Sequence, residues 1–146
     1  MNNEAMFSSG TEHWSTPIEL FDELNLEHKF TVDVCADTTN YKVKRYFNKK
    51  TDGLAQSWDG EVAWCNPPYG KEIKLWIEKA YESTKTVGCN TTVVMLLPAR
   101  TDTRWFHEFI YNNPLCSVKF IKGRLKFSGS KNSAPFPSMV VTFKSL

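Results

Sequence analysis

The chain has 146 residues, of which 41% are hydrophobic, 23% charged and 14% aromatic. This length is typical of a single domain, and the aromatic content excludes a disordered chain. No run approaches the ~18 apolar residues of a membrane span, and the N-terminus lacks a basic stretch followed by an apolar one, so the sequence predicts neither a membrane protein nor a secreted one.

Charge and cysteines narrow the class further. From Arg100 to Leu146 eight basic residues stand against two acidic ones, a formal charge of +6, which leaves −4 of the overall +2 for the first 99 residues. A basic end suits an anionic partner such as nucleic acid, and charge alone supports a plain solvated surface equally well. The four cysteines form no C-x-x-C pair, so we expect reduced, mostly buried thiols in the cytoplasm and no metal site.

The N-terminal half predicts one helix and three strands. Residues 1–13 are polar, and we expect a loose terminus there. Ser15-Thr16-Pro17 predicts a hydroxyl cap followed by proline at the first helical position, with a helix over about 17–26. Patterning predicts strands over 30–35, 41–47 and 61–65, with a turn at 49–53, and the third strand runs directly into Asn66-Pro67-Pro68-Tyr69.

In the C-terminal half, predicted helices again alternate with predicted strands. Apolar spacing predicts helices over 71–86 and 103–111, a central strand over 91–97, and closing strands over 117–121, 125–127 and 139–143. A basic loop occupies 128–135. The whole predicts a single-domain α/β fold, with a mixed, mostly parallel sheet and helices on both faces. In such sheets ligands bind beyond the carboxyl ends of the strands.

The Asn66-Pro67-Pro68-Tyr69 segment carries the clearest chemistry. Two prolines at a strand end stop pairing and stiffen the turn, so the Asn66 amide and the Pro67 carbonyl can converge as acceptors beside the flat ring of Tyr69. Such a site fits a planar ligand bearing an amino group, whose positive charge two acceptors stabilise as it attacks. The alternative is a plain turn with Tyr69 covering the core, but the position between an apolar strand and an amphipathic helix favours function.

A second strand end is acidic. Asp33-Val34-Cys35-Ala36-Asp37 follows the first predicted strand, and its carboxylates either receive an ammonium group or ribose hydroxyls, or merely form a turn. Neither G-x-G-x-x-G nor G-x-x-x-x-G-K-[ST] occurs, so the sequence shows no dinucleotide fingerprint and no triphosphate loop.

Taken together, these residues resemble the phage-type (Dam-like) DNA N-6-adenine methyltransferases over about 13–144. The resemblance rests on Thr16-Pro17, the Asp-Val-Cys-Ala-Asp strand end, Asp52-Gly53-Leu54, Trp58, the stretch Trp64 to Gly70, the stretch Leu96 to Phe106, Gly123-Arg124-Leu125-Lys126-Phe127, and Pro137 to Val141.

The resemblance implies a Rossmann-like fold that uses S-adenosylmethionine to methylate N6 of DNA adenine. It implies that Asn66 and the Pro67 carbonyl, with Pro68 in the same turn, receive the amino group, and that Tyr69 stacks on a base flipped out of the duplex. It also implies that cofactor contacts come from six residues: Thr16, Pro17, Asp33, Ala36, Asp52 and Leu54. We place Trp14 near the cofactor as well, because it stands beside Thr16. The first strand end lacks the glycines common in larger methyltransferases, so the detailed contacts stay open.

The DNA contacts and the assembly follow less directly. We expect residues 1–146 to form one methyltransferase domain without a separate target-recognition domain. Loops such as 128–137, a homodimer or a partner subunit then choose the site, or the sequence preference is weak. A phage-encoded protein acting in the bacterial host cytoplasm is the expected setting. The predicted phosphate contacts are Arg100, Arg104, Lys122, Arg124 and Lys131.

Two alternatives remain open on the sequence. The same tetrapeptide resembles the site of enzymes that methylate RNA bases or glutamine amides, and the basic C-terminal third favours nucleic acid without separating DNA from RNA. A catalytically silent nucleic-acid-binding module would keep the fold alone, and the intact Asn66-Pro67-Pro68-Tyr69 argues against it.

Overall fold

A mixed β-sheet organises the computed structural model, which describes residues 14–146; the terminus predicted to be loose, 1–13, lies outside them. Within the described part the strands are β1 (Val32–Asp33), β2 (Val62–Cys65), β3 (Thr92–Pro98), β4 (Cys116–Phe120) and β5 (Ser138–Lys144), in the order β1-β2-β3-β5-β4. β1, β2 and β3 pair in parallel, and β5 is antiparallel to both β3 and β4. Four strands therefore share one direction and β5 alone is reversed, which confirms the mixed α/β sheet.

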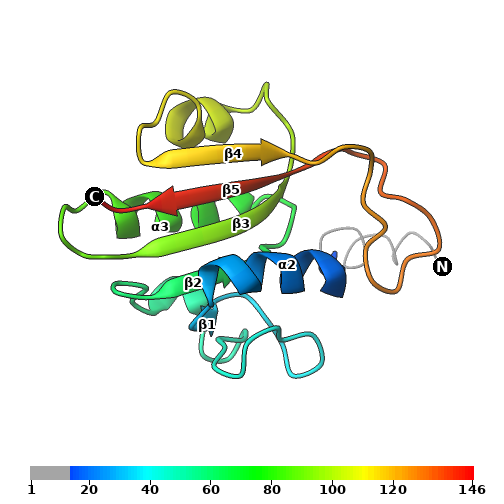
Figure 1. Ribbon diagram of the computed structural model, residues 1–146, viewed down its shortest axis with the longest axis horizontal. Helices are drawn as coiled ribbons and strands as arrows, with labels where there is room; N and C mark the ends of the chain where they lie inside the picture. The colour runs from blue at the N-terminus through cyan, green and yellow to red at the C-terminus, as the bar shows by residue number, and fades with distance from the viewer. Residues whose placement is uncertain (1–13) are drawn as a thin grey trace.

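Helices cover the two faces of this sheet. Figure 1 shows α2 (Ile18–His28) crossing in front of the sheet and α3 (Ile73–Thr84) lying behind it. The Phe21 ring of α2 packs edge-on against Trp64 of β2, with 5.4 Å between ring centroids. α3 contacts β3 and β5 and places the buried side chains of Trp76 and Ile77 against the core. Burial of these two apolar faces fixes both helices to the sheet.

Two segments predicted to be strands, 41–47 and 125–127, form no strand in the described residues. The 41–47 segment forms one bridge between Tyr46 and Asp33, because β1 is only two residues long and offers few partners. The 125–127 segment bonds instead within its own loop: the Ala134 amide donates to the Leu125 carbonyl, and the Ser130 amide donates to the Phe127 carbonyl. These local bonds use the backbone groups that a strand ladder would need.

Two predictions about helices are wrong: the hydroxyl cap at Thr16 and the α-helix over 103–111. The first helix begins at Ile18, with Pro17 in the cap position and no side-chain cap bond, so the predicted hydroxyl cap is wrong. The predicted 103–111 helix is largely a π-helix, η2 (Phe106–Ile110), which the Tyr111 amide closes by donating to the Phe106 carbonyl at 2.8 Å. Aromatic spacing predicts the buried face and not the width of the turn.

Thiol burial is lower than predicted. All four cysteines are free, but only Cys65 is fully buried, and the other three are half-buried. No helix of the described residues is long and apolar enough to cross a membrane.

The reversal of β5 brings the chain's polar segments to one edge of the sheet. The carboxyl ends of β1, β2 and β3 share an edge because these strands are parallel. Pro98 at the end of β3 pairs with Ser138 at the start of β5, and Phe120 at the end of β4 pairs with Met139. The loop 121–137, which joins β4 to β5, therefore leaves from the same edge as Asn66.

Candidate active site

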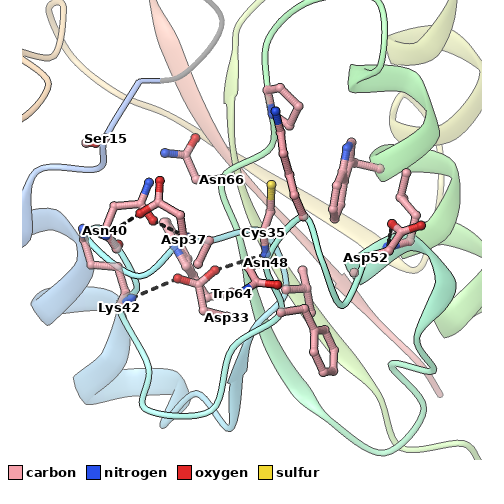
Figure 2. A pocket seen from close by; sticks show the side chains of 18 of the residues that line it. Ser15, Asp33, Cys35, Asp37, Asn40, Lys42, Asn48, Asp52, Trp64 and Asn66 are labelled. Carbon is pink, nitrogen blue, oxygen red and sulfur yellow. Dashed lines mark hydrogen bonds between the residues drawn. The ribbon is translucent and has the colours of Figure 1, made fainter. Parts of the chain in front are cut away.

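A cavity of about 600 Å³ lies beyond the carboxyl ends of β1 and β2. Its walls come from residues 14–16, from the segment after β1, from the turn around Asp52 and from the start of the segment after β2. Figure 2 shows Asp37 and Lys42 on one side of this cavity and Asp52 on the other. The position agrees with the rule that ligands of α/β sheets bind beyond strand ends.

Asp33, the last residue of β1, supplies a buried carboxylate. Its Oδ2 accepts the Lys42 amide at 2.9 Å, and its Oδ1 accepts the Cys35 amide at 3.2 Å. Desolvation by burial outweighs these bonds and raises the pKa of Asp33 from 3.8 to about 6. At neutral pH the cavity therefore holds an ionised carboxylate that burial disfavours and that a cationic ligand would stabilise.

The opposite wall depends on a close backbone approach at Gly53. A Cβ on Gly53 would lie 2.0 Å from the Val34 carbonyl oxygen, so no side chain fits there. The Gly53 carbonyl accepts the buried Trp58 indole N–H at 2.9 Å. Asp52 immediately before it has a positive φ of 56° and accepts the Leu54 amide at 3.2 Å. Glycine thus allows the Asp52 turn to close against the end of β1.

Asn66 stands at the inner end of the cavity with its amide held in one orientation. The amide nitrogen Nδ2 donates to the Trp14 carbonyl and to Thr16 Oγ1, the latter at 3.0 Å. Oδ1 is buried and has no hydrogen-bond partner. A buried acceptor without a partner costs about 1–3 kcal/mol, so this oxygen marks a place where a donor is missing.

Tyr69 is buried rather than open to a ligand. Its side chain is 4% exposed, and its hydroxyl donates to the Leu96 carbonyl at 2.8 Å. The ring packs against Phe136 and Phe127, with centroids 5.7 and 6.5 Å away, and both phenyl rings also contact Trp14. Burial raises the pKa of the Tyr69 phenol well above its usual 10, so the hydroxyl acts as a donor to Leu96.

The predicted site residues divide between the cavity and its surroundings. Six of the seven predicted cofactor residues line the cavity, and Pro17 does not. Among the predicted catalytic residues, Asn66 and Pro68 line it, whereas Pro67 and Tyr69 are buried outside the lining. Sequence reasoning assigned no site role to other residues of the lining, notably Cys35, Asn40, Lys42, Asn48, Gly53, Trp64, Glu72 and Trp76.

The predicted phosphate contacts are all exposed, and they lie on two segments, the one that follows β3 and the loop 121–137. The guanidinium of Arg100 lies 6.0 Å from the centroid of the Phe136 ring. Among the described residues, none of the five forms an ion pair with a carboxylate. They are Arg100, Arg104, Lys122, Arg124 and Lys131.

The mixed sheet with helices on both faces and a cavity at its strand ends define a protein of the α/β class. The family model described as DNA N-6-adenine-methyltransferase (Dam) matches residues 5–146, and the chain belongs to this family.

Two relatives carry the same name. A DNA N-6-adenine-methyltransferase of Haemophilus phage HP1 (strain HP1c1) is 34% identical over 106 residues, which cover 71% of this chain and 60% of the relative. A DNA N-6-adenine-methyltransferase of Escherichia phage T1 is 32% identical over 97 residues, 65% of this chain and 39% of the relative. The matched region thus spans less than two thirds of the length of either relative.

Proposed function

We propose that this chain transfers a methyl group from S-adenosylmethionine to N6 of adenine in DNA. The observation that carries the proposal is the buried, unpartnered Oδ1 of Asn66, a residue that lines the same cavity as the buried carboxylate of Asp33. The family and both similar phage proteins are named for adenine N6 methylation. The missing donor at Asn66 matches an amino group, which is the group that this reaction methylates.

The cavity fits the methyl donor in size and charge. Its volume of about 600 Å³ lies within the ~300–1,000 Å³ usual for small-molecule sites. S-adenosylmethionine, when bound, supplies an electrophilic methyl group on a positively charged sulfur. The Asp33 carboxylate would receive the ammonium group, and Asp52 with Leu54 would border the adenine ring. The order of the strands around the reversed β5 is compatible with the Rossmann-like methyltransferase fold that we propose.

Asn66 would act on the substrate amine. The exocyclic amine of adenine is a poor nucleophile because its lone pair is delocalised into the ring. Oδ1 of Asn66 would accept a hydrogen bond from this amine and stabilise the positive charge that grows on nitrogen as the N–C bond forms and the S–C bond of the donor breaks. The nitrogen would lose its proton to solvent after the transfer. Removal of one such preorganised group costs roughly 10²–10³ in rate in comparable sites. The Pro67 carbonyl stays the predicted second acceptor.

Base flipping would require the aromatic cluster of Trp14, Tyr69, Phe127 and Phe136 to rearrange. Tyr69 is the ring predicted to stack on the extruded base, and Phe127 and Phe136 lie against it. Both phenylalanines lie in the loop 121–137, which also carries Lys122, Arg124 and Lys131. We infer that contact of this loop with DNA moves the two rings aside and admits the base.

Transfer of labelled methyl from S-adenosylmethionine to unmethylated DNA, RNA and protein in parallel tests the proposal. We expect label on N6 of DNA adenine, detected as N6-methyladenosine after digestion. Asn66→Ala should abolish transfer while the dissociation constant of the cofactor stays close to that of the wild type. The matched control is Asn90→Gly, which removes an exposed asparagine just before β3, at the opposite edge of the sheet from Asn66, and glycine suits its positive φ of 54°.

Two results would contradict the proposal. Label found only on RNA or on glutamine would show that the acceptor is not DNA adenine. No label on any acceptor, together with no cofactor-induced thermal shift, would favour a silent nucleic-acid-binding module.

A further inference from the structure

We propose that Thr16 is a positioning residue, whose hydroxyl holds the Asn66 side-chain amide in the orientation that presents Oδ1 to the substrate amine. The inference rests on the proposed function, and the contact that carries it is the hydrogen bond from Asn66 Nδ2 to Thr16 Oγ1 at 3.0 Å. Patterning and the family resemblance predict two other roles for Thr16, a helix cap and a cofactor contact.

The orientation of this amide decides the chemistry. An asparagine amide can flip by 180°, which exchanges its oxygen and nitrogen with little change of shape, so its hydrogen-bond partners alone select one state. Here the Trp14 carbonyl can only accept, so it selects the state in which Nδ2 faces it. The Thr16 hydroxyl could serve either state, and by accepting the second Nδ2 proton as a hydrogen bond it restrains the amide in the selected one. The flipped state would set Oδ1 against that carbonyl and would turn an NH₂ group toward the substrate amine, donor against donor.

Thr16 is free to serve Asn66 because the helix does not use it. The hydroxyl lies immediately before the Pro17 cap position of α2, yet the structure gives the helix no side-chain cap bond. Thr16 is also 2% exposed, so water does not compete for the hydroxyl. A buried hydroxyl that accepts from the catalytic amide, and not from a helix amide, belongs functionally to the site.

The backbone that carries this hydroxyl is fixed from the opposite side. The Ser128 amide donates to the Ser15 carbonyl at 3.0 Å, and the Ser128 hydroxyl donates to the Thr16 carbonyl at 3.1 Å. Asn66 itself is fixed between Cys65 of β2 and Pro67. Both partners of the Asn66–Thr16 bond are thus anchored, so the bond can orient the amide rather than follow it.

Two pairs of variants test this role by separating the hydroxyl from the methyl group. Thr16→Val keeps the shape and removes the hydroxyl, and Thr16→Ser keeps the hydroxyl. Thr16→Ser and Thr16→Ala form a second pair that differs by the hydroxyl alone, in case valine prevents folding. The Trp14 carbonyl still holds Nδ2, so we expect kcat for DNA methylation to fall roughly 3- to 10-fold in the variants without the hydroxyl, as loss of one ordinary hydrogen bond implies. The serine variant should keep wild-type kcat.

Cofactor affinity separates this role from its rivals. A positioning role leaves the dissociation constant of S-adenosylmethionine unchanged, whereas a direct cofactor contact raises it in Thr16→Val with kcat at saturation unchanged. A purely structural role makes the serine variant as slow as the alanine one. Either result would overturn the inference. Thr142→Val, in β5 and away from the cavity, controls for a threonine-to-valine change as such.

An NMR readout keeps the inference testable apart from activity. The side-chain ¹⁵N resonances of Asn66, assigned by their loss in Asn66→Ala, should shift and exchange faster with solvent in Thr16→Val but not in Thr16→Ser. Unchanged Asn66 resonances in Thr16→Val would refute the inference even if the wild type methylates DNA. A shift in an enzyme that methylates no acceptor would instead refute the proposed function alone.

Discussion

At the scale of single residues, Gly53 offers the sharpest test of the packing around the cavity. Gly53→Ala would push a Cβ to 2.0 Å from the Val34 carbonyl oxygen, and backbone on both sides cannot yield. We expect a loss of about 3 kcal/mol in the free energy of unfolding, or roughly 10 °C in Tm for a chain of this length.

The control for that prediction is Gly60→Ala. Nothing lies within 4 Å of a Cβ at Gly60, where φ is +77°, so only left-handed strain of about 1 kcal/mol is expected. The two losses in the free energy of unfolding are measured by thermal denaturation. Equal losses would show that the close approach to the Val34 carbonyl does not exclude a side chain at position 53.

The raised pKa of Asp33 predicts that the free energy of unfolding depends on pH. Its pKa is about 6 in the folded protein against 3.8 ordinarily, because burial disfavours the charge. Between these values the folded state keeps a proton that the unfolded state has released, so the contribution of Asp33 to the free energy of unfolding falls as the pH rises through this window, by about 2–3 kcal/mol. Denaturant titrations of the wild type and Asp33→Asn from pH 4 to 7 isolate this contribution, and curves that stay parallel would contradict it. In the same range, affinity for S-adenosylmethionine should rise with pH only in the wild type.

The sequence allows a residue to be placed near the cavity where its side chain lies next to a recognisable strand end. Asp33 and Asn66 were singled out from their positions after apolar strands, and both line the cavity. Thr16 was also selected, but its contact with Asn66 spans 50 positions of the chain, and local patterning assigned its hydroxyl to the helix instead. Lys42 and Glu72 had no local signal, since their place in the cavity depends on how distant segments pack.

At the scale of elements, the loop 121–137 is the predicted DNA contact. Lys122→Gln and Arg124→Gln should each weaken DNA binding and reduce the slope of log K against log salt concentration by about 0.9, because each removes one phosphate contact. Lys144→Gln is the matched control, since Lys144 pairs with Thr92 at the opposite end of β5 from the site. Affinities measured at several salt concentrations, with slopes unchanged in both loop variants, would remove these residues from the interface.

The long apolar elements were predicted well and the short polar ones poorly. β3 was expected over 91–97 and spans Thr92–Pro98, and α3 was expected over 71–86 and spans Ile73–Thr84. These elements bury enough apolar surface for their periodicity to dominate. The 41–47 and 125–127 segments have the composition of strands, but their backbone groups find partners in a single bridge or in turns, and that outcome depends on neighbours far along the chain.

At the scale of the whole molecule, the candidate site is assembled from regions that only the sheet brings together. Asn66, in the segment after β2, bonds to Thr16, which precedes α2. Ser128 of the loop 121–137 bonds to the backbone carbonyls of Ser15 and Thr16. The sequence predicted the α/β class and the strand-end position of the site, since both follow from alternation of elements. It could not predict the contact between residues 16 and 128, which requires the reversal of β5.

The same reversal has a consequence for how such a protein can diverge. Because the ladder between β4 and β5 fixes both ends of the loop 121–137, its length can change without shifting the register of any strand. Doubling a flexible connection costs only about 0.6 kcal/mol in closure entropy. Insertions near its exposed tip around Asn132 would therefore leave the sheet and the Asn66 turn intact. Under the proposed function, descendants of one ancestor would then be able to exchange target preference while they retain the same reaction.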